Sequence, residues 1–68
     1  MTILLDPDVV AVLVSRLTDS EAEELWQYGG DTANRMAYCI RTSEWLMRRF
    51  PGEWKQSGKF WYPAAELN

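Results

Sequence analysis

Apolar side chains recur at helical spacing near the start of the chain. The positions i, i+3, i+4 and i+7 of this stretch are Val10, Leu13, Val14 and Leu17. Asp6-Pro7-Asp8 precedes them and predicts a helix start, because the Asp6 carboxylate can accept from first-turn N–H groups and proline suits the first helical position. The β-branched run 9–14 would also suit a buried strand. The cap and the spacing together favour a helix.

A second helix is predicted after Thr18. Thr18-Asp19-Ser20-Glu21 has the form of a capping box, in which the Thr18 hydroxyl and the Glu21 carboxylate satisfy each other's backbone N–H groups. Leu25 and Trp26 are expected to supply its apolar face. Gly29-Gly30 is expected to end it, because glycine adopts the left-handed capping conformation at little cost.

A third helix is expected to begin at Asp31, and its length is ambiguous. Its predicted buried stripe consists of Ala33, Met36, Ala37 and Ile40. The helix either runs through to Phe50, or Thr42 or Ser43 caps a separate fourth helix. Both alternatives stay open. Pro51-Gly52 ends the helical part in either case, because the residue before a proline is pushed out of the helical region.

The C-terminal segment has a pattern typical of a β-hairpin. Residues 53–56 and 59–62 flank a two-residue loop, Ser57-Gly58. The pairs predicted by this register are Gln56 with Lys59, Lys55 with Phe60, and Trp54 with Trp61. Pro63 closes the second strand, and residues 64–67 are compatible with a final helical turn.

These elements predict a single α+β domain over residues 1–68, mostly α, with three to four short helices followed by a C-terminal, wing-like β-hairpin. A chain of 68 residues is marginal on its own, since it buries only about 60% of its unfolded surface. Four tryptophans can each bury roughly 150–250 Å². Most aromatic side chains, and the small apolar Cys39, are therefore expected in the core.

Charge is distributed unevenly along the chain, whose net charge is −3. Residues 1–30 hold one cation and six anions, whereas residues 31–68 hold six cations and four anions. Such asymmetry is typical of a protein whose basic part contacts a polyanion or another acidic partner. An equally good interpretation is that the two halves attract each other within the fold.

Several kinds of chemistry are excluded by residue type. The chain has no histidine and a single cysteine, which removes the commonest general base and any thiolate metal site. It contains no phosphate-binding glycine motif, and capping accounts for its paired carboxylates. We therefore expect a protein that is not an enzyme and uses no cofactor, metal or small-molecule substrate.

The lone cysteine points to a reducing compartment. No leader-like start and no apolar run of membrane-spanning length is present, so we expect a cytoplasmic protein without a membrane partner.

The remaining chemistry is that of recognition. Arginines and short hydroxyls cluster around one helical segment, and further polar side chains are predicted near the hairpin tip. The candidate nucleic-acid-binding residues are Arg41, Thr42, Ser43, Met47, Arg48, Arg49, Lys55, Gln56 and Lys59. Such groups meet phosphates and base edges. The alternative is that they are solvated charges on the polar side of an amphipathic helix.

From Ala33 to Leu67 the chain resembles the small winged helix-turn-helix proteins of the phage excisionase and MerR-like group. The motifs that carry the resemblance are Arg41-Thr42-Ser43, Trp45-Leu46-Met47-Arg48-Arg49, Phe50-Pro51, Ser57-Gly58-Lys59-Phe60-Trp61-Tyr62-Pro63 and Ala64-Ala65-Glu66-Leu67. The resemblance implies a phage- or plasmid-type protein that binds double-stranded DNA. It places Ser43, Glu44, Met47 and Arg48 on a groove-facing helix, and Lys55, Gln56 and Lys59 on the wing.

Two functions are therefore expected as alternatives. The first is a DNA-binding or architectural protein that acts through residues 41–59. The second is a small protein-interaction module, such as an adaptor, a host-protein inhibitor or a homodimer. It would use the apolar N-terminal helix, because a helix apolar nearly all round is either central in the core or covered by a partner.

Overall fold

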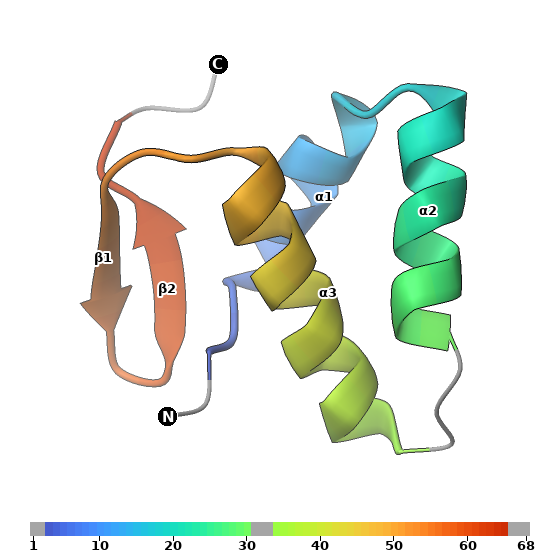
Figure 1. Cartoon of the computed structure of the whole chain (residues 1–68). Coiled ribbons are helices and arrows are strands. Elements are labelled where there is room, and N and C mark those ends of the chain that lie inside the picture. Colours follow the sequence, from blue (N-terminus) through green and yellow to red (C-terminus); the bar gives the residue numbers. More distant parts are fainter. Residues whose placement is uncertain (1–2, 31–33, 66–68) are drawn as a thin grey trace.

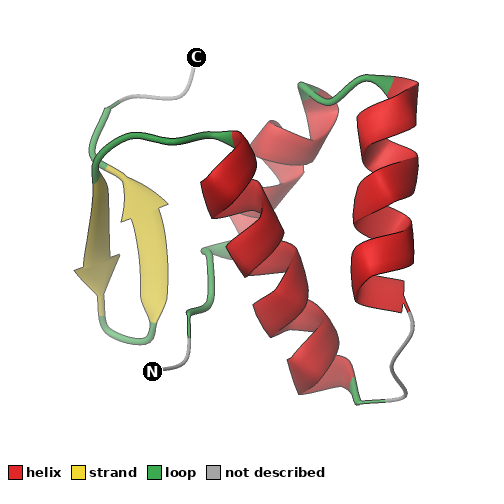
Figure 2. Ribbon diagram, in the orientation of Figure 1, coloured by secondary structure: helices red, strands yellow, loops and turns green. Residues whose placement is uncertain are grey.

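The computed structural model describes residues 3–30 and 34–65 (Figure 1). Its elements, in chain order, are α1 (Pro7–Ser15), α2 (Asp19–Gly30), α3 (Arg35–Arg49), β1 (Trp54–Ser57) and β2 (Phe60–Pro63). The predicted class, α+β and mostly helical with a C-terminal antiparallel hairpin, is confirmed with three helices (Figure 2). No helix within the described residues is long and apolar enough to cross a membrane.

Helix α3 occupies the middle of the fold. Figure 1 shows α2 on one side of α3, the hairpin on the other, and α1 crossing behind. The N-terminal segment runs between α3 and the hairpin. There the Asp6 N–H donates to the Trp61 carbonyl at 3.0 Å, and the Trp61 N–H donates to the Leu4 carbonyl at 2.7 Å. Leu5 thus forms a parallel bridge to β2, a pairing that the sequence did not indicate.

Four leucines form the buried core, one from the N-terminal segment and one from each helix. They are Leu5, Leu13, Leu25 and Leu46. Partly buried side chains packed against them include Val9, Val10, Leu17, Trp45, Met47, Phe50, Trp54 and Trp61. The prediction that the tryptophans are mainly core is therefore confirmed for three of the four.

The apolar residues of α1 point mainly into this core. Leu13 is buried, and Val10 and Leu17 pack against the leucine cluster. Val14, on the same predicted face, is 38% exposed. The apolar face of α1 is therefore covered within the chain at Val10, Leu13 and Leu17 and exposed at Val14.

Local capping follows the sequence closely. Asp6 accepts from the Asp8 N–H at 2.9 Å, and Pro7 occupies the first turn of α1. The capping box is formed, with Glu21 N–H to Thr18 Oγ1 at 3.2 Å and Thr18 N–H to Glu21 Oε1 at 3.1 Å.

Helix α3 is one continuous helix, which resolves the ambiguity over residues 32–50. Its N-cap is Asn34, whose side chain accepts from the Ala37 N–H at 3.1 Å, whereas the expected cap Asp31 lies outside the described residues. The Ser43 hydroxyl donates to the Cys39 carbonyl at 2.8 Å, so it bonds back into the helix and does not start a new one. The helix ends before Pro51, as predicted.

The predicted buried face of α3 is corrected at Met36, which is 56% exposed, whereas Ala37 and Ile40 are half-buried and Ala33 lies outside the described residues. Cys39, also expected in the core, is exposed, and the buried residues are Thr42, Ser43 and Leu46. Two hydroxyl residues, which the pattern of apolar positions could not identify, face the core together with Leu46. The expected stripe is therefore rotated round the helix.

The glycines that end α2 also behave differently from expectation. Gly29 and Gly30 are both helical, and neither has the left-handed conformation expected of a cap. A Cβ at Gly29 would lie 3.1 Å from Thr42 Oγ1 and 3.2 Å from the Tyr38 ring. Gly29 is therefore a close-approach residue between α2 and α3.

The hairpin is confirmed, but its two-residue loop lies one position later than predicted, at 58–59 in place of 57–58. The cross-strand pairs therefore differ from the predicted ones. The pairs are Trp54 with Pro63, Lys55 with Tyr62, Gln56 with Trp61, and Ser57 with Phe60. The turn is Gly58-Lys59, and Gly58 has a φ of 61°. A two-residue turn with glycine at the first central position and positive φ there is of type II′. The prediction placed glycine second, as type I′ turns do.

Candidate nucleic-acid interface

The outer face of α3 carries two arginines, Arg41 and Arg48. They are seven positions apart, which places them two turns apart on the same face, with Glu44 between them. Both arginines are exposed, and the buried residues of the helix lie on the opposite side. Within the described residues, Arg41 forms no ion pair or side-chain hydrogen bond and is fully available to a partner.

Arg48 is held in place by Tyr28 of α2. Its Nη2 donates to the Tyr28 hydroxyl at 2.9 Å, and its guanidinium carbon lies 5.4 Å from the centre of the Tyr28 ring. A guanidinium has five N–H donors, so this contact leaves donors for a phosphate or a base edge. Sequence reasoning missed Tyr28, because nothing near it in the chain indicates a contact with a residue 20 positions away.

Arg49 is paired with Glu21 at the start of α2. Its Nε and Nη2 both donate to the Glu21 carboxylate. These hydrogen bonds, joined by the backbone N–H of Thr18, lower the pKa of Glu21 from 4.5 to about 2 and raise that of Arg49. The attraction between the acidic and basic halves of the chain therefore accounts for Arg49. This corrects the prediction that Arg49 is a nucleic-acid-binding residue, because its guanidinium is paired within the chain.

The ion pair predicts a pH-dependent contribution to stability. Because the folded-state pKa of Glu21 is depressed, its stabilisation is fully present above 4.5 and is lost as the pH falls towards 2. We expect the melting temperature of the unmodified chain to exceed that of Glu21→Gln at pH 7, and the difference to shrink progressively as the pH falls from 4.5 towards 2. Circular dichroism melts across this range measure it. In an Arg49→Gln background the pH-dependent difference is expected to shrink, and an unchanged difference there would contradict the pairing.

Thr42 and Ser43 are not available to a partner, which corrects both predictions. They are only 7% and 2% exposed. The Ser43 hydroxyl accepts from the Leu5 N–H at 3.0 Å and donates within α3, so it ties the N-terminal segment to the helix. The Thr42 hydroxyl faces Gly29 and has no hydrogen-bond partner among the described residues. Met47 is half-buried and packs against the leucine core, so it is at most marginal to an outer surface.

The hairpin brings further polar groups beside α3. Lys55, Gln56 and Lys59 are all exposed, and the Lys59 Nζ lies 5.3 Å from the centre of the Phe60 ring. Successive side chains of a strand point to opposite faces, so Lys55 and Gln56 do not share one surface. Gln56 lies on the face of Trp61, its cross-strand partner, which packs on the core. Arg41, Arg48, Lys55 and Lys59 are the predicted site residues that are exposed and charged and that form no ion pair within the described residues.

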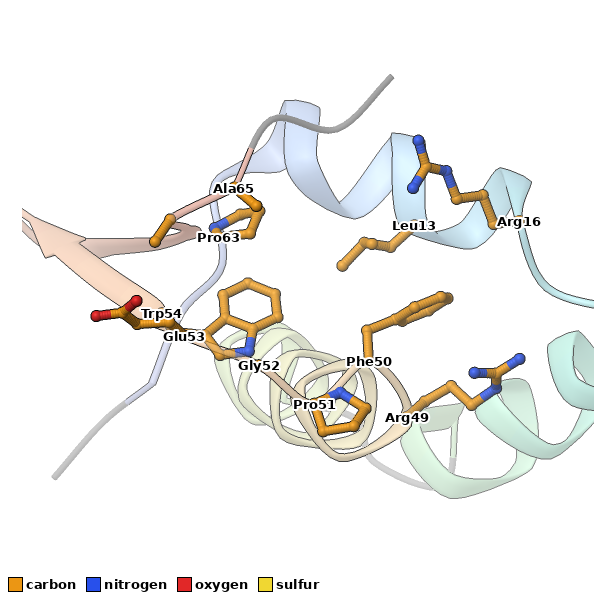
Figure 3. A pocket seen from close by; sticks show the side chains of 11 residues that line it. Leu13, Arg16, Arg49, Phe50, Pro51, Gly52, Glu53, Trp54, Pro63 and Ala65 are labelled. Atoms are coloured by element: carbon orange, nitrogen blue, oxygen red, sulfur yellow. The ribbon is translucent and has the colours of Figure 1, made fainter.

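A pocket of about 540 Å³ lies between the end of α1, the end of α3 and the hairpin base. Figure 3 shows Leu13, Phe50 and Trp54 around it, with the guanidinium groups of Arg16 and Arg49 on one side. The Trp54 Nε1 is buried and has no hydrogen-bond partner among the described residues. The lining offers apolar contact, two guanidinium groups and the Glu53 carboxylate, but no nucleophile beside an acid–base pair.

The described residues contain no group of three or more His, Cys, Asp or Glu side chains able to hold a metal ion. Comparison of the chain with protein-family models, with curated proteins and with solved structures found no match.

Proposed function

We propose that this chain is a small DNA-binding module that contacts double-stranded DNA through the outer face of α3 and the adjacent hairpin. The observation that carries the proposal is the placement of its exposed cations. Arg41 and Arg48 project from one face of α3, and Lys55 and Lys59 extend from the hairpin that follows it. The acidic residues of the first 30 positions, including the paired Glu21, lie outside α3 and the hairpin.

The geometry suits a duplex for two reasons. The major groove admits an α-helix, and arginine binds phosphates or guanine edges with two parallel hydrogen bonds. Arg41 and Arg48 are spaced along α3 so that both reach the same side. Glu44 lies between the two arginines and repels phosphate. It therefore disfavours a geometry in which the whole outer face of α3 lies against the phosphate backbone. It favours a geometry in which the arginines reach the backbone and Glu44 faces a base edge, where a carboxylate can accept from cytosine.

In the proposal the hairpin acts as a wing beside a groove-facing α3. The hairpin is held by the N-terminal segment, which pairs with β2 and whose Leu5 N–H donates to the Ser43 hydroxyl of α3. This arrangement supports the resemblance to winged helix-turn-helix proteins of the phage excisionase and MerR-like group. In the proposal Lys55 and Lys59 contact phosphates flanking the site bound by α3.

The test is the salt dependence of binding to a fluorescently labelled duplex of about 20 base pairs, measured by anisotropy. Each phosphate contact releases counterions, so four cationic contacts predict a slope of about −3 to −4 in log K against log salt. Arg41→Ala and Arg48→Ala are each expected to reduce the steepness by about 1. Arg16→Gln, which removes a cation from the end of α1, is the control and leaves the slope unchanged.

Two outcomes would contradict the proposal. One is the absence of duplex binding at low salt, where electrostatic binding is strongest. The other is an Arg16→Gln variant that weakens binding as much as Arg48→Ala does, because the attraction would then depend on charge without a defined surface.

A further inference from the structure

Trp26 is the most exposed large apolar side chain of the described residues, at 68%. The expectation that it lies on the apolar face of its helix is wrong. Leu25 and Gly29 of α2 face α3, whereas Trp26 is displaced round the helix from them. The other three tryptophans pack against the leucine core. Trp26 therefore contributes little to the stability of the fold.

The indole of Trp26 is supported by the helix on one side. A Cβ at Gly30, one turn further along, would lie 3.8 Å from the Trp26 Cε2 and 3.9 Å from its Nε1. The Trp26 ring therefore lies along α2 beside Gly30, at ordinary van der Waals distance from where a Cβ would be. A large aromatic side chain that is supported on one side and exposed on the other is typical of an interface anchor.

Carboxylates share this stripe of the helix. Counting from the first residue, positions i, i+4, i+7 and i+11 are Asp19, Glu23, Trp26 and Gly30, which fall on one face. Asp19 and Glu23 are exposed. The helix has no lysine or arginine among its twelve residues. The charged residues that α2 itself contributes to this stripe are therefore all negative.

We infer that the α2 stripe formed by Asp19, Glu23, Trp26 and Gly30 docks a basic segment of a partner protein. A lysine or arginine of the partner lies over the exposed face of the Trp26 ring, attracted by its electrons, while its charge is paired with Glu23. The charge of the stripe selects this occupant, because a nucleic acid or an acidic peptide would be repelled.

A second copy of the chain fits the stripe less well than a separate partner. Arg49 is paired with Glu21, and Arg48 is engaged by Tyr28 within the same chain. Arg41 and the hairpin lysines lie on elements other than α2. The α2 stripe is separate from the proposed DNA surface, and the inference does not depend on DNA binding.

The experiment uses the ¹⁵N-labelled full chain and a synthetic helical peptide of about 15 residues with arginines on one face. A peptide with glutamine at those positions is the control probe. We expect the arginine peptide to shift the Trp26 indole N–H signal and the α2 amide signals. Trp26→Ala is expected to weaken binding at least about tenfold, as loss of an interface anchor does.

Charge variants separate docking from general attraction. Glu23→Lys keeps the indole and reverses the paired charge, and it is expected to abolish binding. Asp8→Asn removes an anion from α1 and should leave affinity within about twofold, because isolated exposed charges interact weakly. Trp26→Ala should retain its helical circular dichroism, and its duplex-binding curve should equal that of the unmodified chain.

The inference fails if Trp26→Ala binds the arginine peptide as tightly as the unmodified chain. It also fails if the shifted signals lie in α3 or the hairpin. Sedimentation of the free chain tests the second-copy alternative: concentration-dependent association that disappears in Trp26→Ala would show that the stripe is occupied by another copy.

Discussion

Leu46→Ala is expected to lower the free energy of unfolding by about 2–5 kcal/mol, the range for removing a buried leucine side chain and leaving a cavity. Leu46 has no exposed surface and lies at the centre of the four-leucine core. Stability of about 0.05–0.15 kcal/mol per residue gives a chain of 68 residues about 3–10 kcal/mol in total. At the lower end of that range, the loss leaves a large part of the population unfolded at room temperature.

Urea denaturation followed by helical circular dichroism measures this effect. Met36→Ala is the matched control, because it truncates a long apolar side chain on the same helix that is 56% exposed. Its expected cost is within about 0.5 kcal/mol, as for other surface substitutions. Equal losses in the two variants would show that the core does not centre on Leu46.

Ser43→Ala is expected to destabilise the chain by about 1–3 kcal/mol, although it removes a single oxygen atom. The Ser43 hydroxyl accepts from the buried Leu5 N–H at 3.0 Å. Without it, that N–H is left without its partner inside the fold, at the cost of desolvation. The N-terminal segment should then separate from α3 more easily, and with it the hairpin that pairs to this segment.

Thr42→Val is the control for this prediction, since it removes the neighbouring hydroxyl at nearly constant volume. The Thr42 Oγ1 has no hydrogen-bond partner among the described residues, so its removal should be neutral or stabilising by up to about 1 kcal/mol. Urea denaturation gives both values, and amide hydrogen exchange at Leu5 reports the local effect. A Ser43→Ala variant as stable as Thr42→Val would show that the Leu5–Ser43 hydrogen bond contributes nothing.

The contrast between these two hydroxyls bears on the proposed function. The sequence predicted that both contact a partner, because short hydroxyls beside arginines are typical of phosphate-binding surfaces. In the fold, Ser43 fixes the segment that positions the hairpin, and so acts on the proposed interface only through its geometry. Duplex binding by Ser43→Ala should therefore weaken together with folding, whereas Arg48→Ala should weaken binding alone.

The sequence by itself determined the features that depend on neighbours in the chain. Helix starts at Asp6-Pro7 and Thr18, and the helix end before Pro51, follow from capping hydrogen bonds and steric limits that span four residues or fewer. The hairpin was predicted for the same reason. Its register was not, because Gly58 serves equally well at either central position of a two-residue turn and only the pairing of the strands decides between them.

The tertiary structure decided which side chains are free to bind. Ser43 meets Leu5, Arg49 meets Glu21 and Arg48 meets Tyr28 across separations of 38, 28 and 20 residues. No spacing rule encodes such contacts, because they depend on how α2, α3 and the N-terminal segment pack. The same packing partly buried three tryptophans and left Trp26 exposed. Residue type supplied the candidate chemistry of this protein, and packing left Arg41, Arg48, Lys55, Lys59 and Trp26 exposed for the proposed contacts.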